Sequence, residues 1–194
     1  MLIGFYDYTV ILTYLSLILG VLGMVLSSKG LFGVAVLCLL LCGICDAFDG
    51  TVARSKKNRT EDEKAFGIQI DSLCDAVSFG VAPALLCYHM GMDSVLGVGI
   101  LTLYCLCGVI RLAFFNVLEA KRQQTESGSG KTYRGLPITS SAIVLPIYYL
   151  LRFLLSWDAF VKGLFLVMSA MGLLFVLDIS VKKPDFGKLL ILNK

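Results

Sequence analysis

Charged residues are scarce in this sequence of 194 residues, where Asp, Glu, Lys and Arg together make up only 16%. A soluble domain usually carries about 25% charged residues, so the composition excludes an ordinary soluble protein. Hydrophobic residues reach 57%, and the chain is too short for two large domains. We therefore expect residues 1–194 to form a single all-α domain embedded in a membrane.

Histidine is almost absent as well, because His89 is the only one in the chain. The seven cysteines all fall in apolar segments, including the closely spaced Cys42 and Cys45. A buried cysteine usually behaves as a small apolar residue, and a thiolate metal site would want supporting ligands. We expect reduced structural thiols rather than a disulfide framework. No Ser, Cys or His stands in an obvious nucleophile arrangement, and no internal repeat is visible.

Long apolar runs, by contrast, fill most of the chain. A membrane-spanning helix needs about 20 mainly apolar residues, and six runs are long enough. The first lacks a positively charged leading region, so we expect it to be a helix of the fold and not a removable targeting segment. The predicted spans are Tyr8–Ser27, Leu31–Ala53, Phe66–Met90, Val95–Leu118, Ile138–Leu155 and Ala159–Asp178.

The basic residues predict how these spans are oriented. Six spans place both ends of the chain and the two longer connectors on one face of the membrane. That face holds thirteen lysines and arginines, whereas the opposite face holds only Lys29, Arg152 and Lys162. Because cytoplasmic loops are enriched in Lys and Arg, we expect both termini to lie in the cytoplasm. A basic face also attracts anionic lipid head groups.

Four acids stand inside the apolar segments. Asp46 and Asp49 lie near the cytoplasmic end of the second span, and Asp71 and Asp75 near that of the third. The spacings i,i+3 and i,i+4 place each pair on one face of its helix. Buried charges of this kind are costly in a bilayer unless something compensates them. Hard divalent cations prefer such oxygen-rich cages. Alternatively, the acids form ion pairs with the nearby basic residues Arg54, Lys56 and Lys57.

Small residues and one arginine surround these acids. Gly50 and Ala53 follow Asp49 on the same predicted helix, and Gly67 begins the next. Small residues let a ligand or another backbone approach closely, and Arg54 can offer a planar fork to a phosphate. A carboxylate cage, small-residue walls and an arginine at a membrane surface together indicate a pyrophosphate-binding site.

These eight positions, spread over thirty residues, resemble the signature of the CDP-alcohol phosphotransferase family. The matching pattern is Asp46-x-x-Asp49-Gly50-x-x-Ala53-Arg54 followed by Gly67-x-x-x-Asp71-x-x-x-Asp75. The resemblance implies a six-helix membrane enzyme, commonly a homodimer. One departure is the connector Ser55–Phe66, which has twelve residues where the family usually has eight.

The resemblance also implies a role for each matching residue. Asp46, Asp49 and Asp71 would ligate a divalent metal, Mg²⁺ or Mn²⁺, with Ca²⁺ a substitute in crystals. Asp75 would complete the metal site and act as the general base. The cytidine diphosphate part of the donor would contact Asp49, Gly50, Ala53, Arg54 and Gly67.

Four further segments are similar to the phosphatidylserine synthase branch of that family: Ile70–Asp75, Ser78–Ala84, Arg111–Asn116 and Gly135–Ser140. This similarity implies CDP-diacylglycerol and L-serine as substrates, with membrane lipids and no nucleic acid as partners. The first span departs from many relatives, because it has Thr13-Tyr14-Leu15-Ser16 in place of an Asn-containing segment.

A serine acceptor needs a cation for its carboxylate. We expect Arg111 or Arg134 to bind it, helped by Asn116, although Arg111 also suits a structural ion pair and Arg134 a phosphate contact. Three other functions remain open: a sibling enzyme that uses glycerol 3-phosphate or an inositol phosphate, a small cation transporter, and a purely structural membrane protein. The transporter is disfavoured because all four acids gather near one interface.

Overall fold

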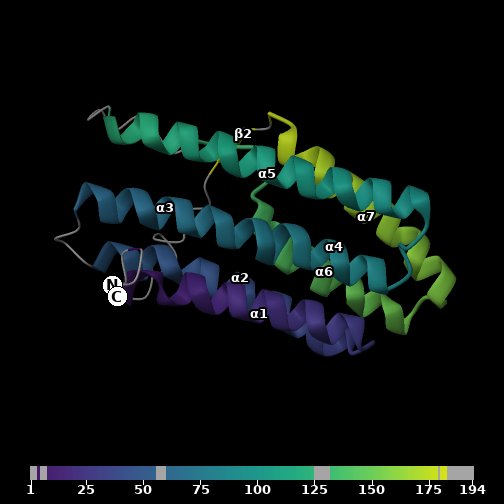
Figure 1. Cartoon of the computed structure of the whole chain (residues 1–194). Coiled ribbons are helices and arrows are strands. Elements are labelled where there is room, and N and C mark those ends of the chain that lie inside the picture. Colours follow the sequence, from purple (N-terminus) through teal and green to yellow (C-terminus); the bar gives the residue numbers. More distant parts are fainter. Residues whose placement is uncertain (1–3, 5–7, 56–59, 125–131, 179, 183–194) are drawn as a thin grey trace, which may run out of the picture.

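The fold is a bundle of roughly parallel and antiparallel helices, seen in a computed structural model that describes residues 4, 8–55, 60–124, 132–178 and 180–182 (Figure 1). Short 3₁₀ turns precede the first and sixth helices and follow the sixth (Tyr8–Val10, Ile138–Ser140 and Leu151–Phe153). The α-helices are α1 (Ile11–Ser28), α2 (Phe32–Ser55), α3 (Glu61–Asp75), α4 (Ala82–His89), α5 (Val95–Gln124), α6 (Ser141–Leu150) and α7 (Trp157–Val176).

The seven labelled helices form six membrane-spanning units, as the sequence predicted. Helices α3 and α4 belong to one continuous helix, because the π-helical turn Ala76–Val81 joins them without a break. Five units are long and apolar enough to cross a membrane, among them Glu61–His89 with 29 residues. The sixth, Ile138–Phe153, is also apolar but shorter. The predicted all-α, polytopic membrane fold is therefore confirmed.

Two helices extend beyond their predicted ends, so the connectors on that side are shorter than expected. The third span was predicted to start at Phe66, but α3 begins at Glu61. Thr60 starts it earlier through a capping box, in which Thr60 Oγ1 accepts from the Glu63 backbone and the Glu63 carboxylate accepts from the Thr60 N–H. Likewise, α5 continues to Gln124 and, at 30 residues, is about 45 Å long, which exceeds the roughly 30 Å hydrocarbon core.

A small two-stranded sheet lies outside the helices and was not predicted. Strand β1 (Thr132–Arg134) pairs antiparallel with β2 (Ser180–Lys182), with Tyr133 opposite Val181. The pairing joins the connector after α5 to the segment after α7. Three-residue strands have too little length to show an alternating pattern, and their partner is distant in sequence, so local sequence signals could not reveal them.

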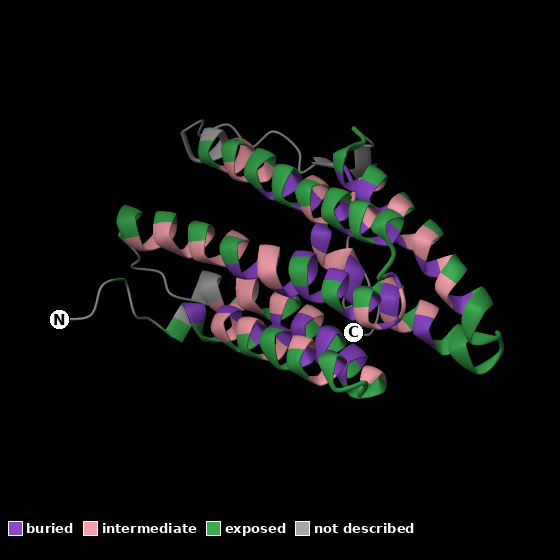
Figure 2. Cartoon of the chain, turned by 45° about the vertical axis from the view of Figure 1, so that its right-hand side comes forward, coloured by how far each residue is buried: buried purple, intermediate pink, exposed green. Residues whose placement is uncertain are grey.

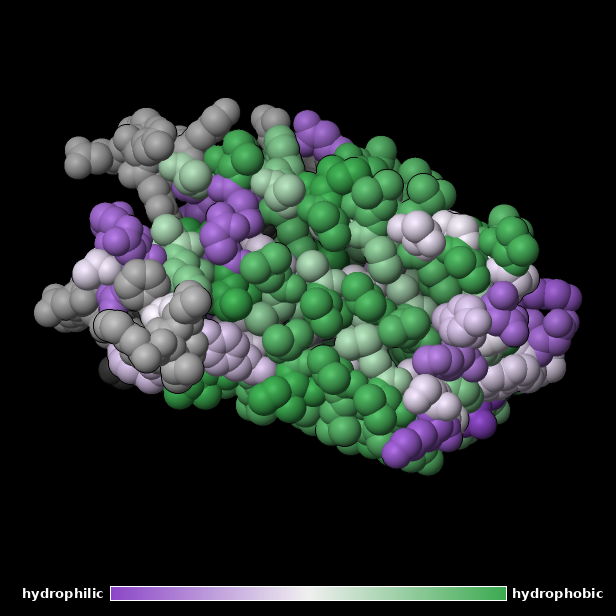
Figure 3. Space-filling model, in the orientation of Figure 1, coloured by the Kyte–Doolittle hydropathy of each residue, from purple (hydrophilic) through white to green (hydrophobic). Residues whose placement is uncertain are grey.

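The outer surface of the bundle is apolar along its middle. Leu96, Leu103 and Ile147 each expose more than half of their surface, and exposed positions face outward along every long helix (Figure 2). Hydrophilic residues gather at the two ends, with a hydrophobic band between them (Figure 3). This distribution is the one that a bilayer requires, because lipid and not water surrounds the middle of the bundle.

Small residues let neighbouring helices approach each other closely at two points of the bundle. A Cβ on Gly43 of α2 would lie 2.6 Å from the Ala142 Cβ of α6, and one on Gly20 of α1 would lie 3.2 Å from the Ser78 Cα. Real Cβ atoms do not tolerate the first distance, so α2 and α6 pack this closely only because residue 43 is glycine. Close packing brings α1 and α6 against the π-helical turn.

Candidate metal centre

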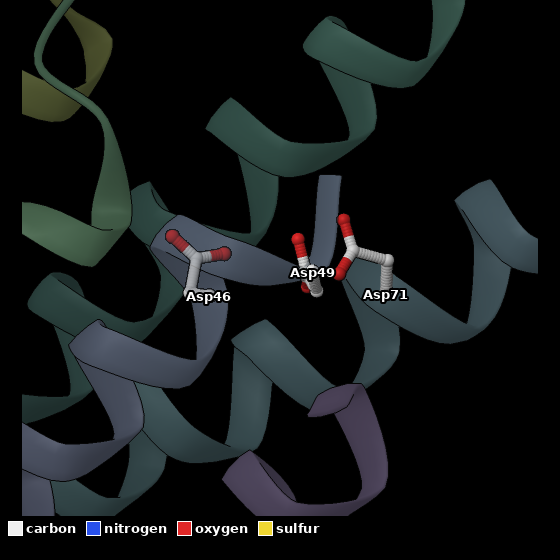
Figure 4. A group of neighbouring side chains, drawn as sticks. All are labelled: Asp46, Asp49 and Asp71. Atoms are coloured by element: carbon white, nitrogen blue, oxygen red, sulfur yellow. The ribbon is translucent and has the colours of Figure 1, made fainter. Parts of the chain in front are cut away.

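Three aspartates from two neighbouring helices converge at one point. Asp46 and Asp49 extend from α2 and Asp71 from α3, and one carboxylate oxygen of each lies within 4.8 Å of the others. Figure 4 shows the Asp49 and Asp71 carboxylates facing each other, with Asp46 one turn away along α2. The i,i+3 spacing puts Asp46 and Asp49 on the same face of α2. The convergence predicted for these three residues is therefore present.

The donor set suits a hard divalent cation. All three side chains are half-buried in an otherwise apolar bundle, where like charges repel strongly because the surroundings screen them poorly. Asp71 Oδ1 is buried and has no hydrogen-bond partner among the described residues. A buried carboxylate oxygen without a partner is unfavourable. Carboxylate oxygens at this separation are the ligands that Mg²⁺, Mn²⁺ and Ca²⁺ prefer, so the residues present fit such an ion.

Asp75 occupies a different position from the other three acids. It lies one helical turn beyond Asp71, at the end of α3, and only 8% of its surface is exposed. It is not a member of the group within 4.8 Å, but it is within electrostatic range of that group and of Arg111. Its predicted role as a fourth metal ligand stays a prediction. Its predicted role as the general base likewise stays a prediction.

Thr13 of α1 is a member of the site that the sequence analysis did not assign. It is buried, at 5% exposure, and its side chain is within hydrogen-bonding reach of the Asp49 carboxylate. A third helix therefore helps to hold the cluster. The available signal was a hydroxyl in the segment Thr13–Ser16, but only helix packing shows that the Thr13 side chain turns toward Asp49.

The residues predicted to contact the cytidine diphosphate lie beside the cluster as far as the structure describes them. Gly50 follows Asp49 directly on α2 and is half-buried, and Gly67 lies one turn before Asp71 on α3. Ala53 and Arg54 belong to the last turns of α2, and their side chains lie outside the described part of the chain. Of the small residues predicted to line the site, the structure therefore describes Gly50 and Gly67.

Two of the three predicted acceptor-binding residues lie on α5 next to α3. Arg111 is 8% exposed, lies near Asp75 and places its guanidinium 5.4 Å from the centre of the Phe115 ring. Asn116 Oδ1 accepts a hydrogen bond of 2.8 Å from Ser72 Oγ. Arg134 ends β1, and its side chain lies outside the described residues. The structure therefore places Arg111 near Asp75 and Asn116 against Ser72 of α3.

Apolar helices long enough to cross a membrane, with a half-buried group of carboxylates among them, indicate a polytopic integral membrane protein. The chain belongs to the CDP-alcohol phosphatidyltransferase family, whose family model matches residues 8–177. That match covers all six helical units and the four aspartates Asp46, Asp49, Asp71 and Asp75.

Relatives in several organisms are similar over most of this chain. An archaetidylserine synthase of Methanothermobacter thermautotrophicus is 35% identical over 86% of the chain, and the chain covers 65% of that protein. A CDP-diacylglycerol–serine O-phosphatidyltransferase of Saccharomyces cerevisiae is 42% identical over 65% of the chain and is covered to 45%. One of Helicobacter pylori is 32% identical over 94% of the chain and is covered to 74%. The chain thus spans between about half and three quarters of these relatives.

Proposed function

We propose that this protein transfers the phosphatidyl group of CDP-diacylglycerol to L-serine and releases CMP. The observation that carries the proposal is the convergence of Asp46, Asp49 and Asp71 inside an apolar bundle. With a divalent cation bound, such a centre would suit the pyrophosphate of a lipid-linked nucleotide, because the cation would bridge the acids and the anionic head while the lipid tails lie along the apolar helices. The choice of serine rests on the names of the relatives.

A divalent ion, Mg²⁺ or Mn²⁺, would be held by Asp46, Asp49 and Asp71, with Asp75 as the further predicted ligand. When bound, it supplies charge neutralisation at the donor pyrophosphate. The unpartnered Asp71 Oδ1 supports this assignment. Asp49, Gly50, Ala53, Arg54 and Gly67 would contact the cytidine diphosphate, with the arginine fork against a phosphate.

In the proposed reaction, the Asp75 carboxylate accepts the proton of the serine hydroxyl. The serine oxygen forms a bond to the phosphorus that is esterified to diacylglycerol. The bond between that phosphorus and the oxygen bridging to the cytidine monophosphate breaks, and CMP leaves with its electron pair. The products are phosphatidylserine, CMP and a protonated Asp75, which returns its proton to solvent. Because no Ser, Cys or His among the described residues stands in an obvious nucleophile arrangement, we propose direct transfer.

The acceptor would be held from α5. The Arg111 guanidinium carries the positive charge that a serine carboxylate needs, and its stacking on Phe115 restricts its orientation. The bond from Ser72 assigns the Asn116 amide oxygen to that contact and leaves the NH₂ group as a donor for the same carboxylate. Arg134 remains a third proposed contact.

We also propose that the site faces the cytoplasm, because the predicted connectors on its side of the bundle carry most of the basic residues. The substrates are a lipid within that leaflet and a soluble amino acid, so an interfacial site reaches both. A homodimer, implied by the family resemblance, stays a prediction.

One incubation separates the proposed function from its alternatives. Purified protein in detergent receives CDP-diacylglycerol and Mn²⁺ with radiolabelled serine, glycerol 3-phosphate or inositol phosphate, and the lipid extract is counted. Label that enters lipid only from serine supports the proposal, whereas label from either phosphorylated acceptor identifies a sibling enzyme. Vesicles with an entrapped Mn²⁺ indicator test the transporter, for which cation flux without lipid product is the expected result. Asp46→Asn serves as the inactive control.

A further inference from the structure

The helix that carries Asp71 and Asp75 changes its winding immediately after Asp75. Residues Ala76–Val81 form a π-helical turn, and the Ala82 N–H donates to the carbonyl of Val77, five residues earlier. Pro83 provides the local cause. It has no N–H to donate to the carbonyl four residues before it, which belongs to Phe79. Turns of this kind are rare and frequently occur at functional sites.

Side chains from two other helices take up the carbonyl that Pro83 leaves without its helical donor. Tyr104 of α5 donates its hydroxyl to the Phe79 oxygen at 2.6 Å, and Ser141 of α6 donates to the same oxygen at 3.3 Å. Tyr104, Phe79 and Ser141 are all almost completely buried. At membrane depth, no water is at hand to replace a missing donor, so these two hydroxyls take the place of the N–H that Pro83 lacks.

The turn is also held from its other side. Ser78 Oγ donates to the Ser16 carbonyl of α1 at 3.3 Å, across the close approach at Gly20. Cys105 Sγ lies 3.6 Å from the Gly80 carbonyl as a weak donor. Helices α1, α5 and α6 therefore all form hydrogen bonds with the π-helical turn.

The winding of this turn sets the direction of Asp75 relative to the helices behind it. Each residue of an α-helix rotates the chain by about 100°, so one additional residue in a turn rotates the preceding segment by that amount relative to the following one. Asp75 is the last residue before the turn, and Phe79 lies four residues further along. If the turn reverted to α-helical winding while α4 kept its packing, Asp75, and Asp71 with it, would rotate by about 100° relative to Arg111 of α5 and to Asp46 and Asp49 of α2.

We propose that Tyr104 and Ser141 are positioning residues, which fix the orientation of Asp75 by holding the Phe79 carbonyl in the π-helical turn. Neither is exposed enough to touch substrate, so both act through the backbone. The inference rests on the proposed function, because it assigns the proton acceptor of that reaction to Asp75. It predicts that removing a single hydroxyl from the core of the bundle impairs turnover and leaves the binding of serine, whose proposed contacts lie on α5, largely intact.

The test compares two Tyr→Phe variants that each remove one hydroxyl bound to a backbone carbonyl. Tyr104→Phe loses the bond to Phe79 but keeps the ring contact with Phe175 at 5.3 Å. Tyr148→Phe is the matched control, because its hydroxyl donates to the Phe160 carbonyl at 2.7 Å, away from the turn. Serine transfer by each variant gives kcat and both KM values. Hydrogen–deuterium exchange over residues 77–84 reports the turn itself, independently of activity.

For Tyr104→Phe we expect kcat to fall about tenfold or more, with the KM for serine within about twofold of wild type. Exchange over residues 77–84 should accelerate in Tyr104→Phe and not in Tyr148→Phe, which should also keep its kcat within about twofold of wild type. Ser141→Ala should show the same pattern with a smaller loss, which supplies the test if Tyr104→Phe does not fold.

The outcomes distinguish the two proposals. If wild-type protein transfers no serine, the proposed function fails and the positioning role fails with it, whatever the exchange shows. If wild-type protein is active and the Tyr104→Phe and Ser141→Ala variants retain the turnover of Tyr148→Phe, the positioning role is overturned, even where exchange accelerates. Equal losses in kcat for Tyr104→Phe and Tyr148→Phe also overturn it, because they indicate a general effect on the bundle.

Discussion

The Ser72 hydroxyl of α3 donates to Asn116 Oδ1 of α5 at 2.8 Å and links two helices across 44 positions of sequence. Ser72 directly follows Asp71, one of the three clustered aspartates. The bond therefore ties the proposed metal centre to the helix that carries the proposed acceptor-binding residues, and it orients the Asn116 amide.

The first prediction follows from this bond. Asn116→Ala should raise KM for serine about tenfold, because it removes a donor to the serine carboxylate and one good hydrogen bond to a charged group contributes about 1.5–3 kcal/mol. Ser72→Ala should raise it less, since the amide remains but loses its orientation. Initial rates over a serine titration measure both effects. The control is Ser28→Ala, which removes an exposed hydroxyl that donates to the Val25 carbonyl within α1. An unaltered KM for serine in Asn116→Ala would exclude the proposed role of Asn116.

The second prediction concerns the acidic cluster without metal. Asp71→Asn should raise the stability of the metal-free protein by about 1 kcal/mol, because it removes repulsion between carboxylates less than 4.8 Å apart. The same change should abolish stabilisation by Mn²⁺, which for wild type reaches about 2.7 kcal/mol at one hundred times Kd. Thermal unfolding with and without Mn²⁺ measures both.

Asp158→Asn is the matched control for this pair of measurements. Asp158 is exposed and pairs with Lys162 at 2.7 Å, at the opposite end of the bundle. Its loss should leave the response to Mn²⁺ unchanged. A full Mn²⁺ response in Asp71→Asn would show that these carboxylates do not hold the ion.

The third prediction separates proton transfer from binding. Asp75→Asn should lower kcat by about 10²–10⁴-fold, the range of general base catalysis, while CDP-diacylglycerol still binds. Asn has nearly the same shape as Asp, so the fall in kcat would come from the lost basicity of the side chain and not from a change in its shape. Transfer assays and binding of a labelled donor measure the two properties. Turnover at the wild-type rate in this variant contradicts the assignment of the base.

The fourth prediction distinguishes two roles of Arg111. If it binds the serine carboxylate, Arg111→Leu should raise KM for serine about tenfold or more and leave donor binding intact. If it only neutralises Asp75, Arg111→Leu should destabilise the protein by about 3–5 kcal/mol, and Asp75→Asn added to it should restore most of that loss. Serine kinetics of the single variant and unfolding of both variants decide between the roles. We expect the first pattern.

The fifth prediction tests the close packing of α2 against α6. Gly43→Ala should destabilise the protein by about 1–3 kcal/mol, because the new methyl would lie 2.6 Å from the Ala142 Cβ. Adding Ala142→Gly should relieve the clash. Gly99→Ala is the control, since nothing lies within 4 Å of its added Cβ, and it should be neutral or stabilising by up to about 1 kcal/mol. Thermal unfolding checks all three; equal stability of the two single alanine variants contradicts the packing argument.

The sequence by itself determined the membrane class, the six spans and the pairs of acids, because each depends on features close together in the chain. Hydrophobic length identifies a span, and i,i+3 or i,i+4 spacing identifies a face of one helix. The predicted ends were less accurate at Phe66 and Leu118, where Thr60 starts one helix early and α5 continues past the membrane.

Tertiary structure decided which groups meet. It brought Asp71 to Asp46 and Asp49, set Asp75 apart, and turned Thr13 toward Asp49. It also paired β1 with β2 and placed the Tyr104 and Ser141 hydroxyls against the Phe79 carbonyl. These relationships join residues far apart in the chain, and they depend on where small residues allow helices to approach. Periodicity within one helix carries no information about that distance, so packing alone fixed the geometry of the site.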